Sequence, residues 1–262
     1  MKLITWNINS VRLRLPLLRK LVAQVKPDII CLQETKVPDD LFPHLEIEAL
    51  GFPYRHIHGM KSYNGVAILS RLPFTGADIH HRAGRQDCRH ISARFKGFTL
   101  HNLYIPAGGD IPDREVNDKF EHKLDLVAEL TQWFPRHHKK TDPVIACGDF
   151  NIAPFEHDVW SHKQLRDVVS HTPVEVDHLR KMQKSLGWTD VARVFIPPQE
   201  KAYTWWSYRN QDWKKSNRGR RLDHVWVTVP LAPHLKSYTA LSKARDWPQP
   251  SDHVPVIVDF SF

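Results

Sequence analysis

The residues best suited to catalysis are carboxylates, amides, a phenol and an imidazole that stand where predicted strands end or begin. They are Asn7, Glu34, Tyr104, Asp149, Asn151, Asp223, Asp252 and His253. Each of them alone has an ordinary structural explanation, because Asp and Asn favour turns and a loop acid or histidine is commonly solvated. Their shared position is the informative feature. Carboxylates, an amide and an imidazole that converge from different strands can form a metal-assisted site.

Strands and helices must bring these side chains together, and the N-terminal segment indicates how. The alternation of side chains predicts a strand over 3–8. One face carries Ile4, Trp6 and Ile8, and the other carries Leu3, Thr5 and Asn7. An amphipathic helix over 17–25 and an apolar strand over 29–32 follow. Strand, helix and strand in this order place Asn7 and Glu34 at the carboxyl ends of two strands, where ligands bind in open α/β sheets.

The rest of the chain predicts more strands than helices. Strands are expected over 65–70, 90–95, 99–105, 144–147, 222–227 and 254–260. One helix includes Phe120 to Thr131 and is expected to end before Pro135, and another includes Val176 to Leu186. Because no low-complexity linker divides the chain, we predict a single α/β domain over residues 1–262, with two packed sheets and helices outside them.

The composition is typical of a folded, basic protein. A hydrophobic content of 41% and a charged content of 25% exclude a predominantly disordered chain. The 37 Lys and Arg residues exceed the 29 Asp and Glu residues by eight, which favours an anionic partner. Three cysteines are too few for a disulfide framework, and the sequence has neither a secretory leader pattern nor a membrane-spanning apolar stretch. We therefore expect a cytoplasmic protein that binds no membrane.

The sequence around the candidate residues resembles one family. The motifs that carry the resemblance are residues 5–9 (TWNIN), 32–36 (LQETK), 64–70 (NGVAILS), 102–106 (NLYIP), 148–151 (GDFN), 221–224 (RLDH) and 251–255 (SDHVP). Their order resembles the exonuclease III and abasic-site (AP) endonuclease family of the endonuclease/exonuclease/phosphatase superfamily, from residue 3 to residue 260. This resemblance implies a four-layer α/β sandwich of two central, mixed or mostly antiparallel sheets flanked by helices.

The resemblance also implies a divalent metal ion. Glu34 would be its main ligand, with help from Asn7 and Asp252. An oxygen-rich set of this kind suits Mg²⁺ or Mn²⁺ better than zinc.

Five further residues would carry out the chemistry that the resemblance implies. Asp149 would activate the attacking water or protonate the leaving oxygen, while Tyr104 and Asn151 would hold the scissile phosphate. His253, oriented by Asp223, would act as the general base or, as a cation, would stabilise charge on the phosphoryl oxygens. Phosphodiester hydrolysis needs an activated water, charge neutralisation and protonation of the departing oxygen, and this set offers a group for each.

A basic, aromatic segment just before Asp223 indicates the substrate. Residues 209–221 contain six Lys or Arg and one Asp, and tryptophans precede and interleave with them. Such a segment suits duplex DNA, which requires neutralisation of its backbone and stacking or wedge surfaces. The substrate-binding candidates are Trp205, Trp206, Arg209, Arg220 and Leu222. The alternative is a solvated basic loop with Trp205 and Trp206 partly in the core.

Two positions depart from the family pattern. Ala107 stands where well-known members carry Asn or Gln near the phosphate, and Arg220 stands where many members place Trp or another apolar residue against the abasic sugar. An arginine there either weakens recognition of an extrahelical sugar or contacts the DNA backbone. The balance of AP endonuclease and exonuclease activity is therefore open at the level of sequence.

We interpret the sequence as a metal-dependent DNA repair nuclease that acts on double-stranded DNA, trims 3′ ends, cuts 5′ to abasic sites, or does both, and is a monomer like its family. Two alternatives remain. One is a phosphoesterase of the same superfamily acting on a small or lipid phosphate, although no membrane-inserting amphipathic stretch is evident. The other is a catalytically weak DNA-binding paralogue, which would be expected to have lost a catalytic residue; none is lost here.

Overall fold

The computed structural model describes residues 1–209 and 212–262, and its centre is a pair of stacked six-stranded sheets. The first sheet contains, in spatial order, β13 (Leu235–Ala240), β14 (Val256–Phe260), β1 (Lys2–Asn7), β2 (Ile29–Gln33), β4 (Val66–Ser70) and β3 (Tyr54–His58). The second contains β5 (Phe74–Ile79), β6 (His90–Phe95), β7 (Phe98–Tyr104), β8 (Val144–Asp149), β12 (Asp223–Val227) and β9 (Thr189–Asp190). A separate two-stranded ribbon pairs β10 (Trp205–Trp206) with β11 (Gly219–Arg220).

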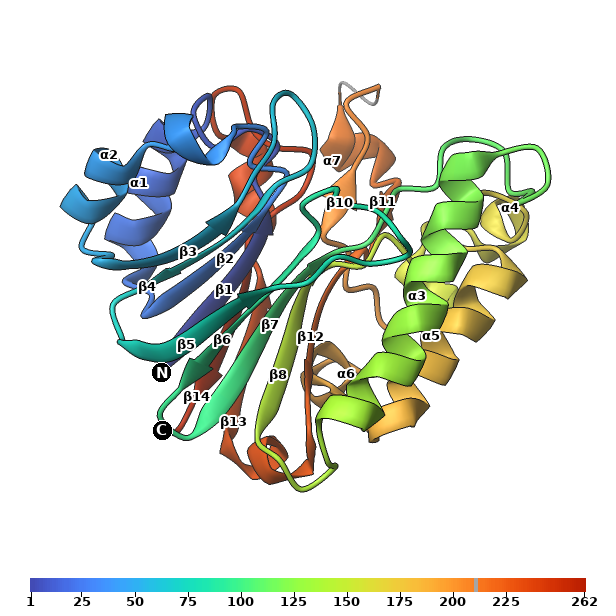
Figure 1. Ribbon diagram of the computed structural model, residues 1–262. Coiled ribbons are helices and arrows are strands. Elements are labelled where there is room, and N and C mark those ends of the chain that lie inside the picture. The colour runs from blue at the N-terminus through green and yellow to red at the C-terminus, as the bar shows by residue number, and fades with distance from the viewer. Residues whose placement is uncertain (210–211) are drawn as a thin grey trace.

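Helices cover the outer face of each sheet, so the molecule has four layers (Figure 1). Helices α1 (Leu15–Val25) and α2 (His44–Ala49) lie outside the first sheet, and α3 (Asp118–His137) and α5 (Pro173–Leu186) lie outside the second. Shorter helices are α4 (His162–Leu165), α6 (Val191–Phe195) and α7 (Trp213–Ser216), with 3₁₀ turns at Asp39–Leu41, Glu156–Asp158, Val229–His234 and Ser242–Asp246. The predicted four-layer sandwich with two mixed sheets is confirmed.

Side-chain alternation along the strands divides the apolar residues between layers. In β1, Ile4 and Trp6 belong to the core that contains α1, whereas Leu3 belongs to the core between the sheets. Cys31 and Cys147 are fully buried in that central core, where they act as small apolar side chains. The period-two pattern of the sequence therefore predicts the two faces of this strand correctly, and both faces are buried.

The end of α3 differs from the prediction. The helix was expected to end before Pro135, but it continues to His137. Proline removes one backbone N–H, and near the end of a helix that loss affects a single hydrogen bond. The buried Phe134 anchors the last turn, and its carbonyl accepts a hydrogen bond of 2.8 Å from the His138 N–H. Tertiary packing therefore carries the helix past the proline.

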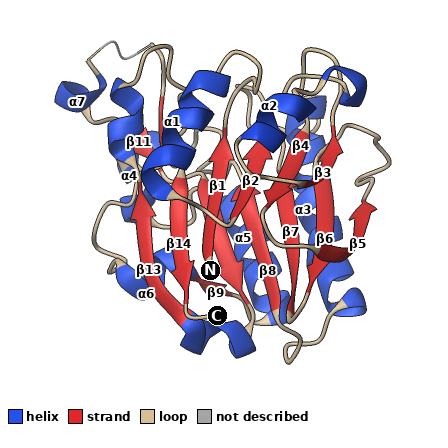
Figure 2. Ribbon diagram, turned by 90° about the vertical axis from the view of Figure 1, so that its left-hand side faces the viewer, coloured by secondary structure: helices blue, strands red, loops and turns tan. Residues whose placement is uncertain are grey.

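Parallel pairing sets the position of the candidate site. Strand β1 is parallel to β2, and β7 is parallel to β8, within sheets whose other pairings are antiparallel. The two strands of each parallel pair therefore have their carboxyl ends side by side. Figure 2 shows β1 and β2 pointing toward the end of the molecule where β11 and α7 lie. Within the described residues, no helix is long and apolar enough to cross a membrane.

Candidate active site

Side chains from both sheets meet at this end of the sandwich. Asn7, Tyr104 and Asp149 are the last residues of β1, β7 and β8, and Glu34 directly follows β2. Asn151 lies just beyond β8, Asp223 opens β12, and Asp252 and His253 precede β14. The structure thus gathers the predicted catalytic and metal-binding residues in one region.

Hydrogen bonds across the gap between the sheets hold the centre of this region. The Asn7 amide donates from Nδ2 to Glu34 Oε1 at 3.0 Å and to Asp149 Oδ2 at 2.9 Å. The Tyr104 hydroxyl donates to Glu34 Oε1 at 2.7 Å. Burial and the Glu34 charge raise the pKa of Tyr104 well above its ordinary value, so the phenol stays protonated and remains a donor.

His253 lies between two carboxylates. Its Nδ1 donates to Asp223 Oδ2 at 2.8 Å, and its Nε2 is 3.6 Å from Asp149 Oδ2. Burial by itself would lower the pKa of His253, but the charges of Asp223 and Asp149 outweigh burial and raise it to about 10. The imidazole is therefore a cation at neutral pH. Burial also raises the pKa of Asp149, against the opposing effect of His253.

Glu34 is held in its ionised form. Burial opposes ionisation, but hydrogen bonds from Asn7 and Lys36 and the charge of Lys36 lower the pKa of this carboxyl. The Lys36 ammonium lies 2.8 Å from Glu34 Oε2. Lys36 was not among the residues predicted for the site. The sequence could have indicated Lys36, because it follows Glu34, the principal candidate ligand, by two residues.

Asn151 is placed by an unusual backbone. Its φ is 52° and that of Glu34 is 51°, both in the left-handed region that most side chains avoid. The Asn151 N–H donates to Asp149 Oδ1 at 2.9 Å, and its side-chain Nδ2 donates to Asp149 Oδ2 at 3.0 Å. Gly148 is required just before, since an added Cβ would lie 1.8 Å from the Leu103 carbonyl oxygen. Strained and close-packed backbone therefore fixes the Asp149 carboxylate.

The donor set around Glu34 fits a hard divalent cation. Glu34 and Asp252 place two carboxylates on the same cleft, and hard oxygen donors are what Mg²⁺ and Mn²⁺ bind. Asn7 behaves differently from the expectation of an oxygen ligand. Its amide nitrogen faces two carboxylates that would otherwise repel each other, and its Oδ1 accepts a hydrogen bond of 3.1 Å from the Asn9 N–H. As placed here, Asn7 orients the carboxylates.

A cleft of about 570 Å³ runs from these residues toward the basic segment. Four of the five predicted substrate-binding residues line it, namely Trp205, Arg209, Arg220 and Leu222. The Trp205 indole donates from Nε1 to Asp252 Oδ2 at 2.9 Å. The Arg220 guanidinium lies 5.3 Å from the centre of the Trp205 ring and donates to Ser170 Oγ at 2.6 Å. The cleft thus joins an acidic end to an end rich in arginine and aromatic side chains.

Trp206 does not line this cleft, which corrects the prediction of a substrate contact. It is buried in the core with Tyr203 and Trp213, and its Nε1 donates to Asn217 Oδ1 at 3.2 Å. The physical reason is strand alternation, because neighbouring residues of β10 point to opposite sides. Of these two neighbouring tryptophans, Trp205 is the one that faces the cleft.

The basic segment over 209–221 is also divided by the fold. Arg209, Arg218 and Arg220 line the cleft, whereas Arg221 is fully buried. Its guanidinium donates to both carboxylate oxygens of Asp158, at 2.7 and 2.9 Å. Residues 210–211 of the segment lie outside the described residues. Part of the net charge therefore supports the core.

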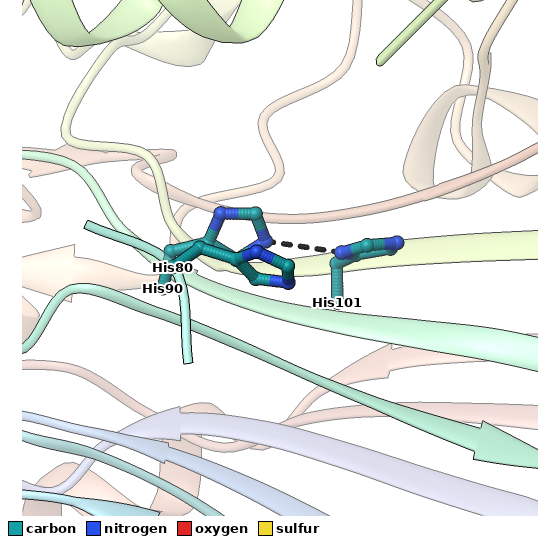
Figure 3. A group of neighbouring side chains, drawn as sticks. All are labelled: His80, His90 and His101. Carbon is teal, nitrogen blue, oxygen red and sulfur yellow. Dashed lines mark hydrogen bonds between the residues drawn. The ribbon is translucent and has the colours of Figure 1, made fainter. Parts of the chain in front are cut away.

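A second group of histidines lies on the outer face of the second sheet (Figure 3). His80, His90 and His101 offer nitrogen atoms within 4.8 Å of one another, a spacing compatible with a metal ion. The hydrogen bonds oppose that interpretation. Arg82 Nε donates to His90 Nδ1 at 3.1 Å, so the proton of His90 resides on Nε2, which donates to His101 Nδ1 at 3.0 Å. A ligand histidine instead keeps one nitrogen free and donates from the other to an acceptor.

Comparisons with known proteins agree with the geometry. A model of the endonuclease/exonuclease/phosphatase family matches residues 4–253. Exodeoxyribonuclease III of Haemophilus influenzae is 30% identical over 99% of this chain and 100% of the relative. Among solved structures, the 3′ phosphatase NExo from Neisseria, bound to a product DNA hairpin, has a TM-score of 0.92 at 32% identity. An AP endonuclease from Archaeoglobus fulgidus has a TM-score of 0.93 at 31% identity, and both cover 100% of each chain.

Proposed function

This chain belongs to the endonuclease/exonuclease/phosphatase family, and from that premise we propose that it is a metal-dependent DNA repair nuclease. It hydrolyses phosphodiester bonds of duplex DNA, as a 3′–5′ exonuclease, an AP endonuclease, or both. The proposal includes Mg²⁺ or Mn²⁺ as the metal and a cytoplasmic monomer as the working form. The observation that carries it is the hydrogen-bonded convergence of Asn7, Glu34, Tyr104, Asp149, Asp223 and His253 beside a cleft lined by arginines.

The positions of the charged groups support different catalytic roles for His253 and Asp149. His253, between Asp149 and Asp223, is a cation that neutralises charge on the phosphoryl oxygens and donates to them. Asp149, whose pKa is raised by burial, is the group that moves the proton of the attacking water or the leaving oxygen. Tyr104 and Asn151, at the ends of neighbouring strands, hold the phosphate in line.

A bound divalent cation would supply Lewis-acid polarisation of a phosphoryl oxygen. Glu34 would hold it, because this carboxylate is ionised, partly buried and open to the cleft. Asp252 would add a second oxygen and, through Trp205, would connect the metal site to the wall of the cleft.

One assay tests the function. The protein is incubated with Mg²⁺ or Mn²⁺ and four labelled duplexes, which are intact, abasic-site, recessed 3′ and 3′-phosphate substrates. We expect metal-dependent cleavage of at least one modified or recessed duplex and loss of cleavage in a chelator. Cleavage of a phosphoinositide head group with every duplex left intact would instead identify the alternative phosphoesterase.

Glu34→Ala should nearly abolish this hydrolysis, because removing the principal carboxylate removes the metal from the reaction. Circular dichroism should show an intact fold. Glu46→Ala, on an exposed position of α2, is the matched control and should keep the wild-type rate. Normal rates in Mg²⁺ for Glu34→Ala would refute the assignment of this ligand.

We further propose that Arg220 favours 3′ exonuclease activity over cleavage at abasic sites. Its guanidinium is anchored on the Val169 carbonyl and Ser170 Oγ, so a charged group stands at the edge of the small apolar pocket around Leu222 and Trp205. Arg220→Trp should raise abasic-site cleavage relative to 3′ trimming, on the order of tenfold.

The matched control for Arg220→Trp is Arg218→Trp, which removes a charge from the same cleft over Trp160. The control should leave the ratio of the two activities unchanged. Unchanged rates of both activities in Arg220→Trp would show that this position does not set specificity.

A further inference from the structure

A buried ion pair lies directly behind the loops that carry the active site. Lys123 of α3 and Glu175 of α5 are both fully buried, and their side chains form a salt bridge. Charged residues are almost never fully buried unless paired, and an apolar pair of similar volume often packs two elements equally well. Contact between α3 and α5 alone therefore does not explain why a lysine and a glutamate stand here.

The ammonium of Lys123 reaches the loops beyond β7 and β8. Nζ donates to the Asn151 carbonyl at 2.8 Å and to the Ala107 carbonyl at 3.2 Å. With the Glu175 carboxylate, these acceptors use all three N–H groups of the ammonium. Lys123 thus ties the segment that follows Tyr104 to the segment that follows Asp149.

The Glu175 carboxylate holds the opposite wall of the cleft. It accepts hydrogen bonds from the Ser170 N–H at 2.9 Å and from the Thr172 hydroxyl at 2.7 Å. Ser170 in turn accepts through Oγ from the Arg220 guanidinium. One ion pair therefore connects the backbone of Asn151 with the segment on which Arg220 is anchored.

We propose that Lys123 and Glu175 are positioning residues for hydrolysis. Their ion pair fixes the Asn151 and Ala107 carbonyls on one side and the 169–172 segment on the other, so that the phosphate-binding loop and the cleft wall keep one relative placement. An apolar pair would fill the same space but would release these carbonyls and N–H groups. The activity part of the inference rests on the proposed nuclease function.

A kinetic experiment separates positioning from general stabilisation. In the double variant Lys123→Met/Glu175→Met, both charges are removed and side-chain volume is nearly kept, so the protein is expected to fold where a single variant leaves an unpaired charge. We expect kcat on the cleaved duplex to fall on the order of 10²-fold. KM should change by less than about threefold, because the lost interaction acts mainly in the transition state.

The control is the ion pair of Arg82 with Glu129, which also involves α3 but lies beside the histidine group of the second sheet. Glu129→Gln breaks that pair and should keep both kcat and KM. A wild-type kcat in the folded Lys123→Met/Glu175→Met variant would overturn the proposal. An equal loss of kcat in Glu129→Gln would also overturn it, because any damaged ion pair would then suffice.

Hydrogen exchange of the free protein tests the same tie without reference to activity. The double variant should exchange faster than wild type in peptides that cover 105–109, 150–153 and 169–172. Glu129→Gln should leave these peptides unchanged. Unchanged exchange in the double variant overturns the proposal even for an active enzyme, whereas an inactive wild type refutes only the proposed function.

Discussion

The histidine of the active site and the histidines on the outer face of the second sheet hold opposite charge states. At the active site, the carboxylates of Asp223 and Asp149 overcome burial and raise the pKa of His253 to about 10. On the outer face of the second sheet, burial and the neighbouring Arg82 lower the pKa of His80 to about 4. Burial disfavours the charged form of both rings, yet His253 is a cation and His80 is neutral, because the charge next to each ring has the opposite sign.

The active-site group and the histidine group also differ in their role, which is catalysis for the first and packing for the second. Both groups contain several possible metal ligands within a few ångströms, so proximity alone does not distinguish them. Hydrogen-bond direction does. His253 donates to a carboxylate and lies in an open cleft, whereas His90 accepts from a guanidinium and is enclosed against Trp133 and Phe134. The first arrangement suits a reaction with an anion. The second stabilises the packing of α3 against the second sheet.

The largest effect is expected at the active site. His253→Gln should lower kcat by about 10²- to 10⁴-fold, because it removes a positioned cation and donor from the reaction. Single-turnover cleavage of labelled duplex in Mg²⁺ measures it, with circular dichroism as the check on folding. A decrease in kcat of less than tenfold would contradict a catalytic role for His253.

His101→Gln should have the opposite profile. His101 lies between His90 Nε2 at 3.0 Å and His138 Nε2 at 2.9 Å, so the variant leaves buried donors and acceptors unpaired. The free energy of unfolding in urea should fall by about 1–3 kcal/mol, while kcat stays at the wild-type value. A loss of activity in a fully folded variant would show that the second group also serves catalysis.

The smallest effect is expected in the pH dependence of stability. The pKa of His80 is lower in the folded than in the unfolded state, so the unfolded chain binds more protons between pH 6.5 and about 4. The stabilising contribution is therefore complete above pH 6.5 and is lost as the pH falls toward 4. His80→Gln should reduce the loss of stability between pH 7 and 5.

The control for this pH experiment is His178→Gln, at a partly exposed position of α5. It should show the same loss of stability as the wild type over that range. If His80→Gln and the wild type lose equal stability between pH 7 and 5, the neutral His80 ring does not contribute to the pH dependence of stability.

The sequence could predict the active site because its residues are marked locally. Asn7, Tyr104 and Asp149 end alternating or apolar strands, and parallel pairing brings such ends together. The layers followed for the same reason, since strand and helix periodicity determine which faces are buried. Trp206 was not predictable in this way. A two-residue strand gives no pattern from which to tell the cleft side from the core side.

The ion pair behind the site and the second histidine group depend on contacts that are remote in sequence. Lys123 did carry a signal, because it stands on the apolar face of α3 between Phe120 and Val127. Glu175 is the third residue after Thr172 and forms a capping box, which explains its position but not its bond to Lys123. Such pairings become visible only when two helices are docked on the sheet.

The catalytic hydrogen bonds that cross between the sheets have a consequence for biosynthesis. Asn7 of β1 bonds to Asp149 of β8, and His253, just before β14, bonds to Asp223 of β12, so both bonds connect the first sheet with the second. A shift of one sheet by one residue, about 3.3 Å, would break these bonds. A growing chain on the ribosome therefore has no competent nuclease until β14 has emerged and paired with β1. DNA-cutting activity appears only when synthesis and folding of both sheets are finished.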